Sequence, residues 1–318
     1  MSQPLVSIVV PCFNYGRFLG DCLSAALNQR NYSNVEVIVI DDASTDDTPS
    51  VIKRFSDPRL IAVRHEKNQG HVITINEGLA MAKGKYVCRI DADDRHRPDF
   101  LEQTIPYLEK DPSLGAVYGE VNLIDEHGAV TTPAPTSVAT LARNIYLDLL
   151  GENFICAPTL IARNELWKQA LPILSGLTHS DWYLNLQMAR RAPFLHRPVT
   201  LAEYRVHSRN LHTQLVMNKG EEPTTFRILD LLYSTVESDA QLEWRKKKIR
   251  RGVYGKQYRS LVLKYYGAGY FADAERCFRE GLKLSPGLFA TPALARVGAA
   301  LLMGVERYER LKQRLKRR

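Results

Sequence analysis

No stretch of the 318-residue sequence approaches the roughly 18 consecutive apolar residues that a membrane-spanning helix needs. The first residues, MSQPLVSIVV, also lack the basic segment and long apolar core of a secretory signal peptide. The five cysteines lie far apart without C-x-x-C spacing, so neither a disulfide framework nor a zinc site is indicated. We therefore expect a cytoplasmic protein with reduced thiols.

The fingerprints of several ligand classes are missing as well. The sequence contains neither a G-x-G-x-x-G dinucleotide motif nor a lysine-containing phosphate loop. No nucleic-acid-reading fold is recognisable, so we expect no nucleic-acid partner. The formal net charge is nevertheless +8, and residues 306–318 hold seven Lys or Arg against two Glu, a net of +5. Such an excess is typical of proteins with an anionic partner.

The composition is that of an ordinary globular protein, with 45% hydrophobic and 25% charged residues. In the first hundred residues, short β-branched runs alternate with helical patterns, which indicates βαβ units and a mainly parallel α/β sheet flanked by helices. The expected strands cover residues 5–10, 35–40, 60–65 and 86–90, and the expected helices cover residues 18–29, 48–55 and 72–83, the last closed by Gly84 as a cap. In such sheets, ligands bind beyond the carboxyl ends of the strands.

The second half of the sequence has a different pattern. Residues 125–137 are rich in Pro, Thr and Gly, which predicts a loop. From about residue 218 the pattern is helical, and residues 269–286 resemble half of a tetratricopeptide-type hairpin, which supports only a packed helical appendix. We predict an α/β domain over residues 1–215 and a helical extension with a basic tail over residues 216–318.

Adjacent carboxylates follow the second expected strand. Asp41 and Asp42 come after residues 35–40, where acidic side chains can accept hydrogen bonds from a base or a ribose. An alternative is that this segment only caps the helix that begins near Thr48.

Three carboxylates in four residues, Asp91, Asp93 and Asp94, follow the expected strand at residues 86–90. The charges of such a cluster repel one another, and a divalent cation relieves the repulsion. Oxygen ligands suit Mn²⁺ or Mg²⁺, and either ion can bridge the protein to a diphosphate. A solvated turn that caps a helix is the alternative.

A further carboxylate, Asp181, stands beside Trp182 and ahead of a helix expected over residues 183–191. An aromatic neighbour can desolvate a carboxylate and raise its basicity, as a general base requires. Capping of that helix by Ser180 or Asp181 is the alternative.

A basic segment follows in the sequence YRVHSRN. Arg205 and Arg209 can face phosphate oxygens, and His207 can ligate a metal or contact a diphosphate. The alternative is that the histidine is structural.

In combination, these segments resemble the family 2 glycosyltransferases of the GT-A fold. The resemblance is carried by VSIVVPCFN at residues 6–14, VEVIVIDDASTDDT at residues 35–48, NQG at residues 68–70 and GKYVCRIDADDRHRPDFLE at residues 84–102. The strings SDW and YRVH follow in the expected order, so the resemblance covers residues 4–212. It implies an enzyme that uses a nucleotide-diphosphate-sugar donor and inverts the anomeric centre.

The resemblance also implies roles for individual residues. Asp181 would be the catalytic base, and Mn²⁺ or Mg²⁺ would be held by Asp93, Asp91 and His207. The nucleotide-sugar donor would be bound by Pro11, Asn14, Asp42, Gly70, Asp91 and Arg205, with Asp42 at the base and Asp91 near the ribose or the metal.

The sequence departs from the family at two positions. Ser180 replaces a Glu that many members carry before the base, and Ile75 replaces an Arg that many carry before Asn76. These changes leave the chemistry in place.

The implied reaction is metal-dependent sugar transfer to a hydroxyl of an unidentified glycan, lipid-linked or protein acceptor, in bacterial cell-surface polysaccharide or glycan assembly. One alternative is a sugar nucleotidyltransferase, although PCFNYGRF replaces the Gly-rich basic loop expected after its first strand. The other is a non-catalytic binding protein built on the same domain.

The last segment, residues 292–318, joins an apolar helix, ALARVGAALLMGV, to the basic string ERYERLKQRLKRR. This pattern can lie on an anionic membrane surface, which would make the protein peripheral on the inner face of the cytoplasmic membrane. The alternative is a packed helix with a solvated basic end.

Overall fold

The computed structural model describes residues 6–134, 145–208, 210, 219–305, 307, 308 and 310. The chain divides into two compact units. The first unit comprises Met1–Leu149 and Asn153–Ser208, and the second comprises Leu150–Glu152 and Arg209–Arg318. Among the described helices, none has both the length and the apolar content that crossing a bilayer requires.

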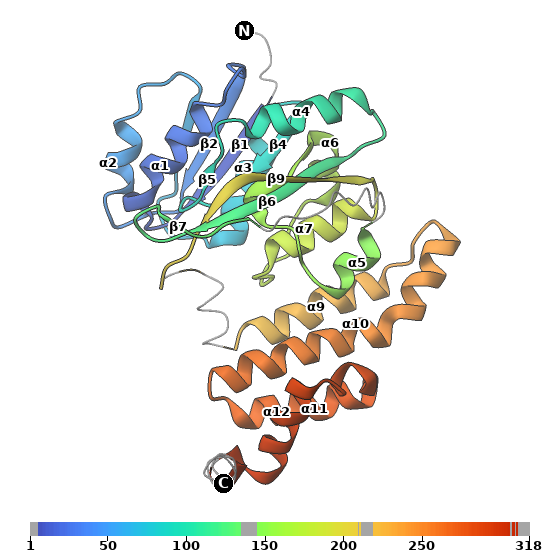
Figure 1. Ribbon diagram of the computed structural model, residues 1–318. Helices are drawn as coiled ribbons and strands as arrows, with labels where there is room; N and C mark the ends of the chain where they lie inside the picture. The colour runs from blue at the N-terminus through green and yellow to red at the C-terminus, as the bar shows by residue number, and fades with distance from the viewer. Residues whose placement is uncertain are drawn as a thin grey trace. The chain divides into compact units, whose positions relative to one another are not determined.

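The first unit is built on a nine-stranded mixed sheet with the order β3-β2-β1-β4-β8-β6-β9-β5, and β7 pairs with β6 (Figure 1). The strands are β1 (Val6–Cys12), β2 (Val35–Asp41), β3 (Leu60–Arg64), β4 (Tyr86–Arg89), β5 (Arg95–His96), β6 (Ala116–Ile124), β7 (Val130–Thr132), β8 (Ile161–Arg163) and β9 (Phe194–Arg205). The four strands expected from the sequence, β1 to β4, are present and mutually parallel, which confirms the predicted fold class.

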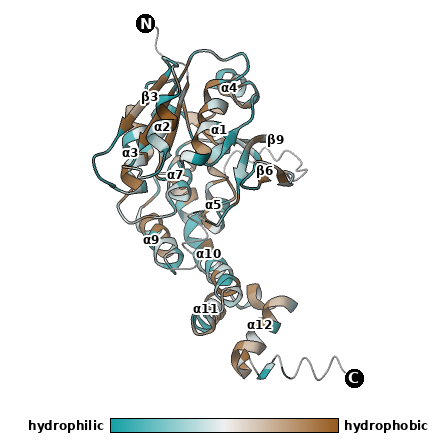
Figure 2. Cartoon of the chain, turned by 90° about the vertical axis from the view of Figure 1, so that its left-hand side faces the viewer, coloured by the Kyte–Doolittle hydropathy of each residue, from teal (hydrophilic) through white to brown (hydrophobic). Residues whose placement is uncertain are grey.

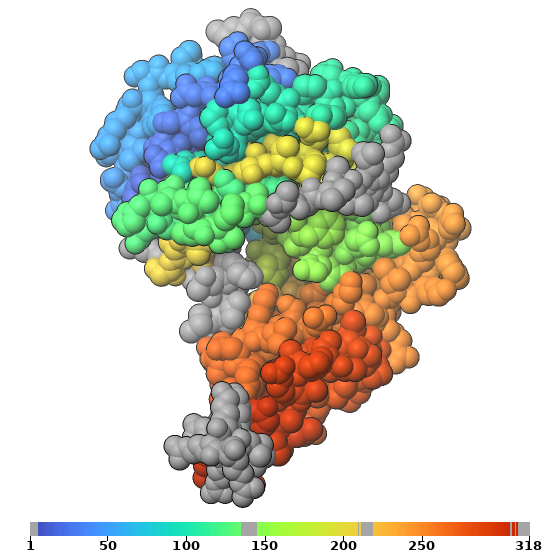
Figure 3. All heavy atoms as spheres, viewed as in Figure 1, coloured from blue at the N-terminus to red at the C-terminus, as the bar shows by residue number. Residues whose placement is uncertain are grey.

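The remaining strands join the sheet in a mixed pattern that the sequence did not indicate. Strand β8 is antiparallel to both β4 and β6, whereas β6 and β9 are parallel to one another. These last two strands lie along each other on the face of the first unit that Figure 3 presents. The loop expected at residues 125–137 is wrong in part, because Val130–Thr132 forms β7 against the end of β6, and residues 135–137 lie outside the described residues.

Helices cover both faces of the parallel strands. The helices up to residue 208 are α1 (Gly16–Leu27), α2 (Thr48–Lys53), α3 (His71–Met81), α4 (Phe100–Lys110), α5 (Tyr146–Gly151), α6 (Asn164–Ala170) and α7 (Ser180–Ala189), with a 3₁₀ turn at Ala157–Thr159. Strand β1 shows the layering, because successive side chains of a strand point to opposite faces. Ile8 packs in the cluster that contains α1 and α4, whereas Val9 lies against α3 at Gly78.

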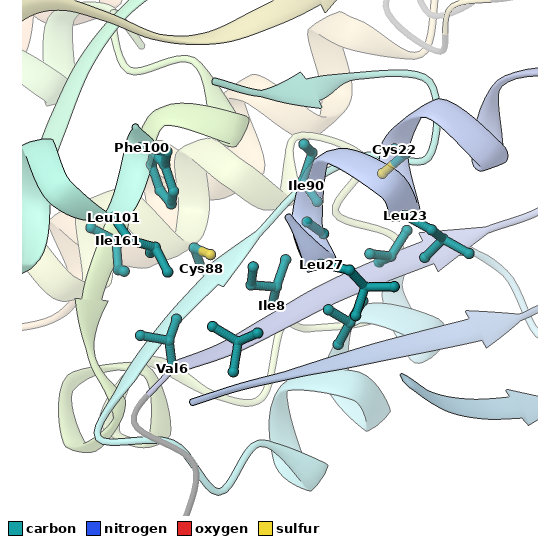
Figure 4. Packing of buried hydrophobic residues seen from close by; sticks show 14 of the residues in the cluster. Val6, Ile8, Cys22, Leu23, Leu27, Cys88, Ile90, Phe100, Leu101 and Ile161 are labelled. Atoms are coloured by element: carbon teal, nitrogen blue, oxygen red, sulfur yellow. The ribbon is translucent and has the colours of Figure 1, made fainter. Parts of the chain in front are cut away.

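The core of the first unit lies between β1, β4, α1 and α4 (Figure 4). Val6 and Ile8 of β1 meet Leu23 and Leu27 of α1, all 5% exposed or less. Helix α1 presents these residues because its apolar side chains recur at helical spacing along one face. All five cysteines are free.

Gly84 has a different role from the expected helix cap. Helix α3 ends at Met81, and its C-cap is Ala82 in an extended conformation. A Cβ on Gly84 would lie 2.6 Å from the backbone nitrogen of Ser7. Glycine is therefore required because β1 approaches it closely.

The second unit is helical, as the sequence predicts beyond residue 218. It contains α9 (Glu221–Ser234), α10 (Ala240–Gly267), α11 (Phe271–Leu284), a 3₁₀ turn at Pro286–Phe289 and α12 (Pro292–Met303). Much of α12 is hydrophobic (Figure 2), and Leu294 and Leu301 pack in the same cluster as Phe278 of α11. One face of α12 is therefore core, while Leu302 and Met303 are exposed. Residues 311–318, the end of the basic tail, lie outside the described residues.

Candidate active site

Loops after β1 and β2 are tied together by Asn14, which has a positive φ of 59°. Its side-chain oxygen accepts hydrogen bonds from the backbone nitrogens of Thr45 at 2.8 Å and Asp46 at 3.3 Å. Its own backbone nitrogen donates to Ser44 Oγ at 2.9 Å. Asn14 therefore fixes the shape of the loop edge, and Pro11 is buried within β1 beneath it.

The carboxylate of Asp42 organises the segment that precedes α3. It is buried, and it accepts hydrogen bonds from the backbone nitrogens of Gln69 at 2.7 Å and Gly70 at 2.8 Å. It also lies 2.7 Å from His65 Nδ1, whose other ring nitrogen is 2.8 Å from Glu77 Oε2. Gly70 takes a φ of 92°, which glycine adopts readily. Asp42 and Gly70, 28 residues apart, are thus joined directly.

These contacts shift two pKa values. Burial alone would raise the pKa of Asp42, but the hydrogen bonds from Gln69, His65 and Gly70 outweigh it and hold the pKa below its usual value. Burial alone would lower the pKa of His65, but its bonds to Asp42 and Glu77 raise it. A carboxylate can accept about four hydrogen bonds, and Gln69, Gly70 and His65 occupy three of these positions on Asp42.

The acidic turn after β4 is packed from behind by Arg205 of β9. The backbone nitrogen of Arg205 donates to Asp94 Oδ1 at 2.8 Å, and its Nε donates to the Asp93 carbonyl at 2.8 Å. The guanidinium also reaches the carbonyls of Asp125 and Glu126 and is buried. This burial does not favour the expected contact between Arg205 and donor phosphates. The second expected arginine, Arg209, lies outside the described residues.

His207 contacts the same turn. Its Nε2 lies 3.0 Å from Asp93 Oδ2. Its ring lies 5.0 Å from the ring of Phe18 and 5.7 Å from that of Tyr15, centroid to centroid. Aromatic side chains therefore surround the contact between His207 and Asp93, and this limits the access of water to it.

The electrostatics of the turn are those of crowded, desolvated carboxylates. Burial raises the pKa of Asp93, which the hydrogen bond with His207 opposes and the Asp91 charge reinforces. Burial raises the pKa of Asp94 well above its usual value, and the charges of Asp93 and Asp91 add to the shift. Asp91 Oδ1 and Asp94 Oδ2 are buried without a hydrogen-bond partner among the described residues.

These unpartnered oxygens fit a hard divalent cation, which takes oxygen ligands. The expected ligands Asp91, Asp93 and His207 do not form a complete metal cage, since the described part of the chain holds no group of three or more His, Cys, Asp or Glu side chains suited to a metal. The donor set therefore fits an ion that completes its coordination with phosphate oxygens and water, as Mg²⁺ does.

Arg89, the last residue of β4, joins the acidic turn to the start of α7. Its guanidinium is buried, with Nη2 3.4 Å from Asp91 Oδ2 and Nη1 3.4 Å from Ser180 Oγ. Asp181, the next residue, is partly exposed, and its Oδ2 accepts a hydrogen bond from Asn153 Nδ2 at 2.8 Å. The structure thus brings Asp91 and the Ser180–Asp181 pair to one place, although 89 residues separate Asp91 from Ser180.

Trp182 anchors this end of α7. Its indole nitrogen donates to the Leu149 carbonyl at 2.7 Å, and its side chain is 4% exposed. The tryptophan therefore fixes the helix on which Asp181 stands.

Sequence reasoning missed several residues of this site, notably Tyr15, His71, Arg89 and Asn153. Burial lowers the pKa of His71, and the charges that act on it include Asp91, which raises the pKa, and Arg89, which lowers it. The positions of His71 directly after NQG and of Arg89 two residues before Asp91 were available signals. Asn153 had none, because only the fold brings it to α7.

The two departures from the family pattern have clear structural places. Ile75 is fully buried in α3. Asn76 exchanges hydrogen bonds with the backbone of Ile173, donating to its carbonyl at 3.0 Å and accepting from its nitrogen at 2.8 Å. Ser180 occupies the contact with Arg89 that a longer acidic side chain would change.

Comparisons with known proteins agree with this fold. The family model described as Glycosyl transferase family 2 matches residues 7–160. An uncharacterised glycosyltransferase of Haemophilus influenzae is 30% identical over 235 residues, covering 71% of this chain and 72% of that protein. A putative teichuronic acid biosynthesis glycosyltransferase of Bacillus subtilis, TuaG, is 27% identical over 208 residues, which cover 64% of this chain and 80% of that protein.

Solved structures show the same architecture. Residues 1–349 of S. aureus TarS, in complex with UDP-GlcNAc, match with a TM-score of 0.67 and 17% identity, covering 94% of this chain and 92% of that one. A mannosyltransferase of Pyrobaculum calidifontis, in complex with GDP-Man and Mn²⁺, matches with a TM-score of 0.59 and 17% identity. The match covers 95% of this chain and 85% of that one. Fold and site thus define a GT-A type transferase. The chain belongs to glycosyltransferase family 2 and is a glycosyltransferase, which sets aside the nucleotidyltransferase and non-catalytic alternatives.

Proposed function

We propose that this enzyme moves a sugar from a nucleotide-diphosphate donor to an acceptor hydroxyl by an inverting single displacement, with Asp181 as the base. The main support for this proposal is the position of Arg89. Its guanidinium lies 3.4 Å from Asp91 Oδ2 in the acidic turn and 3.4 Å from Oγ of Ser180, the residue before Asp181. One buried side chain thus contacts both Asp91, which we assign to the donor end of the site, and Ser180, the neighbour of the residue that we assign to the acceptor end.

Asp181 would take the proton of the acceptor hydroxyl as that oxygen bonds to the anomeric carbon. The bond between the anomeric carbon and the donor phosphate oxygen breaks in the same step, and the nucleotide diphosphate leaves with its electrons. The hydrogen bond from Asn153 orients the Asp181 carboxylate for this transfer.

Asp93 and Asp91 would hold Mn²⁺ or Mg²⁺. His207 contacts the Asp93 carboxylate and would orient it. When bound, the cation would neutralise charge on the departing diphosphate. The unpartnered oxygen of Asp91 supports this assignment, as does the Mn²⁺ in the structurally similar mannosyltransferase. Arg205 acts here as a positioning residue, because its donors hold the backbone of the acidic turn.

The nucleotide would bind along the loops after β1 and β2, against Pro11, Asn14, Asp42 and Gly70. The TarS structure with UDP-GlcNAc supports a nucleotide-sugar partner of this kind. We assign this catalytic role to residues 1–215 and treat residues 216–318 as an extension.

The relationship to TuaG supports a place in polysaccharide assembly, with a glycan, lipid-linked or protein acceptor. Such a role fits a cytoplasmic enzyme that is peripheral to the membrane. The basic tail beyond α12 is one candidate for contact with an anionic membrane surface.

Replacing Asp181 with Asn tests the base. We expect kcat to fall by roughly 10²–10⁴-fold, because proton transfer by a positioned base contributes about that much. Donor binding, measured by calorimetry with the nucleotide sugar that the wild type uses, should not change. Asp148→Asn, an exposed change of the same kind on α5, is the control. Wild-type turnover by Asp181→Asn would disprove the assignment.

A further inference from the structure

The α9–α10 hairpin carries a concentration of positive charge apart from the basic tail. Residues 244–251 read WRKKKIRR, with six Lys or Arg and no Asp or Glu. Lys246 alone is buried, and its Nζ bonds to Glu237 Oε1 at 2.8 Å and to the Thr235 carbonyl at 2.5 Å. The other five basic side chains are exposed.

Four exposed residues share one face of α10. Trp244, Lys247, Lys248 and Arg251 recur at the i, i+3, i+4 and i+7 spacing that places side chains on one side of a helix. We call these four residues the basic face. The Trp244 side chain is 60% exposed, and Lys248 Nζ lies 4.8 Å from its ring centroid.

The turn before α10 adds an aliphatic side chain at the same end of the hairpin. Val236 is 73% exposed. The residue after it is tied to α10, because the Glu237 backbone nitrogen donates to Glu243 Oε2 at 3.0 Å and Lys246 binds both glutamates. The exposed apolar groups are therefore presented by a fixed scaffold.

We propose that the basic face of α10 docks on an anionic lipid surface. Tryptophan favours the interface between headgroups and acyl chains, and Lys or Arg near an anionic surface adds attraction. Lys247 is paired with Glu243 at 3.1 Å, but no carboxylate in the described part of the chain forms an ion pair with Arg245, Lys248 or Arg251. Their charge is thus available to phosphate headgroups. The proposal goes beyond the sugar-transfer function and does not depend on it.

A nucleic acid is the less favoured partner for this surface. Binding to single strands relies on aromatic platforms on which successive bases stack. The basic face offers one aromatic residue, Trp244, and Val236, in the turn before the helix, has no π face. An aliphatic and an aromatic group next to lysines match a lipid interface better.

Vesicle co-sedimentation of the full-length chain tests the proposal. Phosphatidylcholine vesicles are compared with vesicles that also contain phosphatidylglycerol. We expect binding only to the anionic vesicles, weakened by at least about tenfold in the basic-face triple variant Lys247→Gln, Lys248→Gln, Arg251→Gln. Trp244→Ala should weaken binding several-fold without changing the circular dichroism spectrum.

Two further triple variants serve as controls, because each also removes three positive charges but at another place in the chain. Lys53→Gln, Arg54→Gln, Lys110→Gln changes exposed residues of the first unit, and Lys312→Gln, Arg314→Gln, Lys316→Gln changes the tail. The proposal expects the first-unit variant to bind like the wild type and the basic-face variant to lose more affinity than the tail variant.

Tryptophan fluorescence gives an independent readout. Trp167 and Trp182 are 3% and 4% exposed, so quenching by brominated lipid reports mainly on Trp244. Quenching on anionic vesicles supports the proposal. Unquenched emission, equal losses in all three triple variants, loss confined to the tail variant, or binding to oligonucleotides without binding to vesicles would overturn it.

Discussion

Single side chains in the donor half act mainly by shaping backbone. Asp42 is an example, because its bonds to Gln69 and Gly70 determine where α3 begins. His65 supports Asp42 from the other side through a second carboxylate, Glu77. The role proposed for Asp42 in base recognition therefore depends on a residue that does not face the nucleotide itself.

His65→Asn should lower the free energy of unfolding by about 1–3 kcal/mol, the usual cost of breaking a buried hydrogen-bond network. The pKa of His65 is raised from its ordinary value of 6.5. The charged ring donates to both carboxylates, whereas a neutral ring has one N–H and donates to only one. The stabilisation is therefore full below about pH 6.5 and declines as the pH rises through the folded-state pKa.

Urea unfolding of both proteins across this pH range measures the effect. His127→Asn, at a side chain that is 84% exposed, is the control and should change little at any pH. A difference between wild type and His65→Asn that grew with increasing pH would contradict the linkage.

At the scale of secondary-structure elements, α3 depends on its close approach to the parallel strands. A Cβ on Gly78 would lie 2.5 Å from Val9 Cγ1 and 3.3 Å from Ile40 Cγ1. Because Gly78 has no side chain, the helix that carries His71 can pack closely on β1 and β2. Gly252, also within a helix, has no neighbouring atom within 4 Å of the equivalent position.

The two glycines should therefore respond oppositely to alanine. Gly78→Ala should destabilise the protein by about 1–3 kcal/mol, because overpacking forces β1 and α3 apart. Gly252→Ala should stabilise it by about 0.5–1 kcal/mol, because alanine is the better helix former and fits without contact. Thermal unfolding measures both. If Gly78→Ala raised the free energy of unfolding, α3 would not be packed against the strands as described.

At the scale of the whole molecule, the two units have separate hydrophobic cores. A ligand that binds only one unit is therefore expected to stabilise only that unit. The proposed donor and cation contact only residues of the first unit. Ligand that binds the native state raises stability by about 2.7 kcal/mol at 100 times Kd. We expect a nucleotide sugar with Mn²⁺ to raise the unfolding temperature of the first unit and to leave that of the second unchanged.

A panel of nucleotide sugars, screened by scanning calorimetry with and without Mn²⁺, measures this effect and narrows the donor. Asp93→Asn should remove the increment due to Mn²⁺, whereas Asp148→Asn should retain it. If Asp93→Asn showed the full increment, the metal assignment would be wrong.

The sequence by itself determined the parallel half of the sheet, the acidic turn at a strand end and the helical second half. These features follow from local patterns, namely apolar periodicity, turn residues and short motifs. A helix near Asp181 could be predicted for the same reason, but it was expected over residues 183–191, whereas it begins at Ser180 and holds Asp181 in its first turn.

Only the tertiary structure decided how the distant segments combine. Strands β6, β8 and β9 enter the sheet in a mixed order, because their pairing depends on long-range packing that no local pattern records. The same packing buries Arg205 behind the acidic turn and Lys246 within the hairpin, although the neighbouring basic residues of α10 stay exposed. A basic residue in the sequence shows that charge is present, but only the fold decides whether that charge faces the protein, a substrate or a surface.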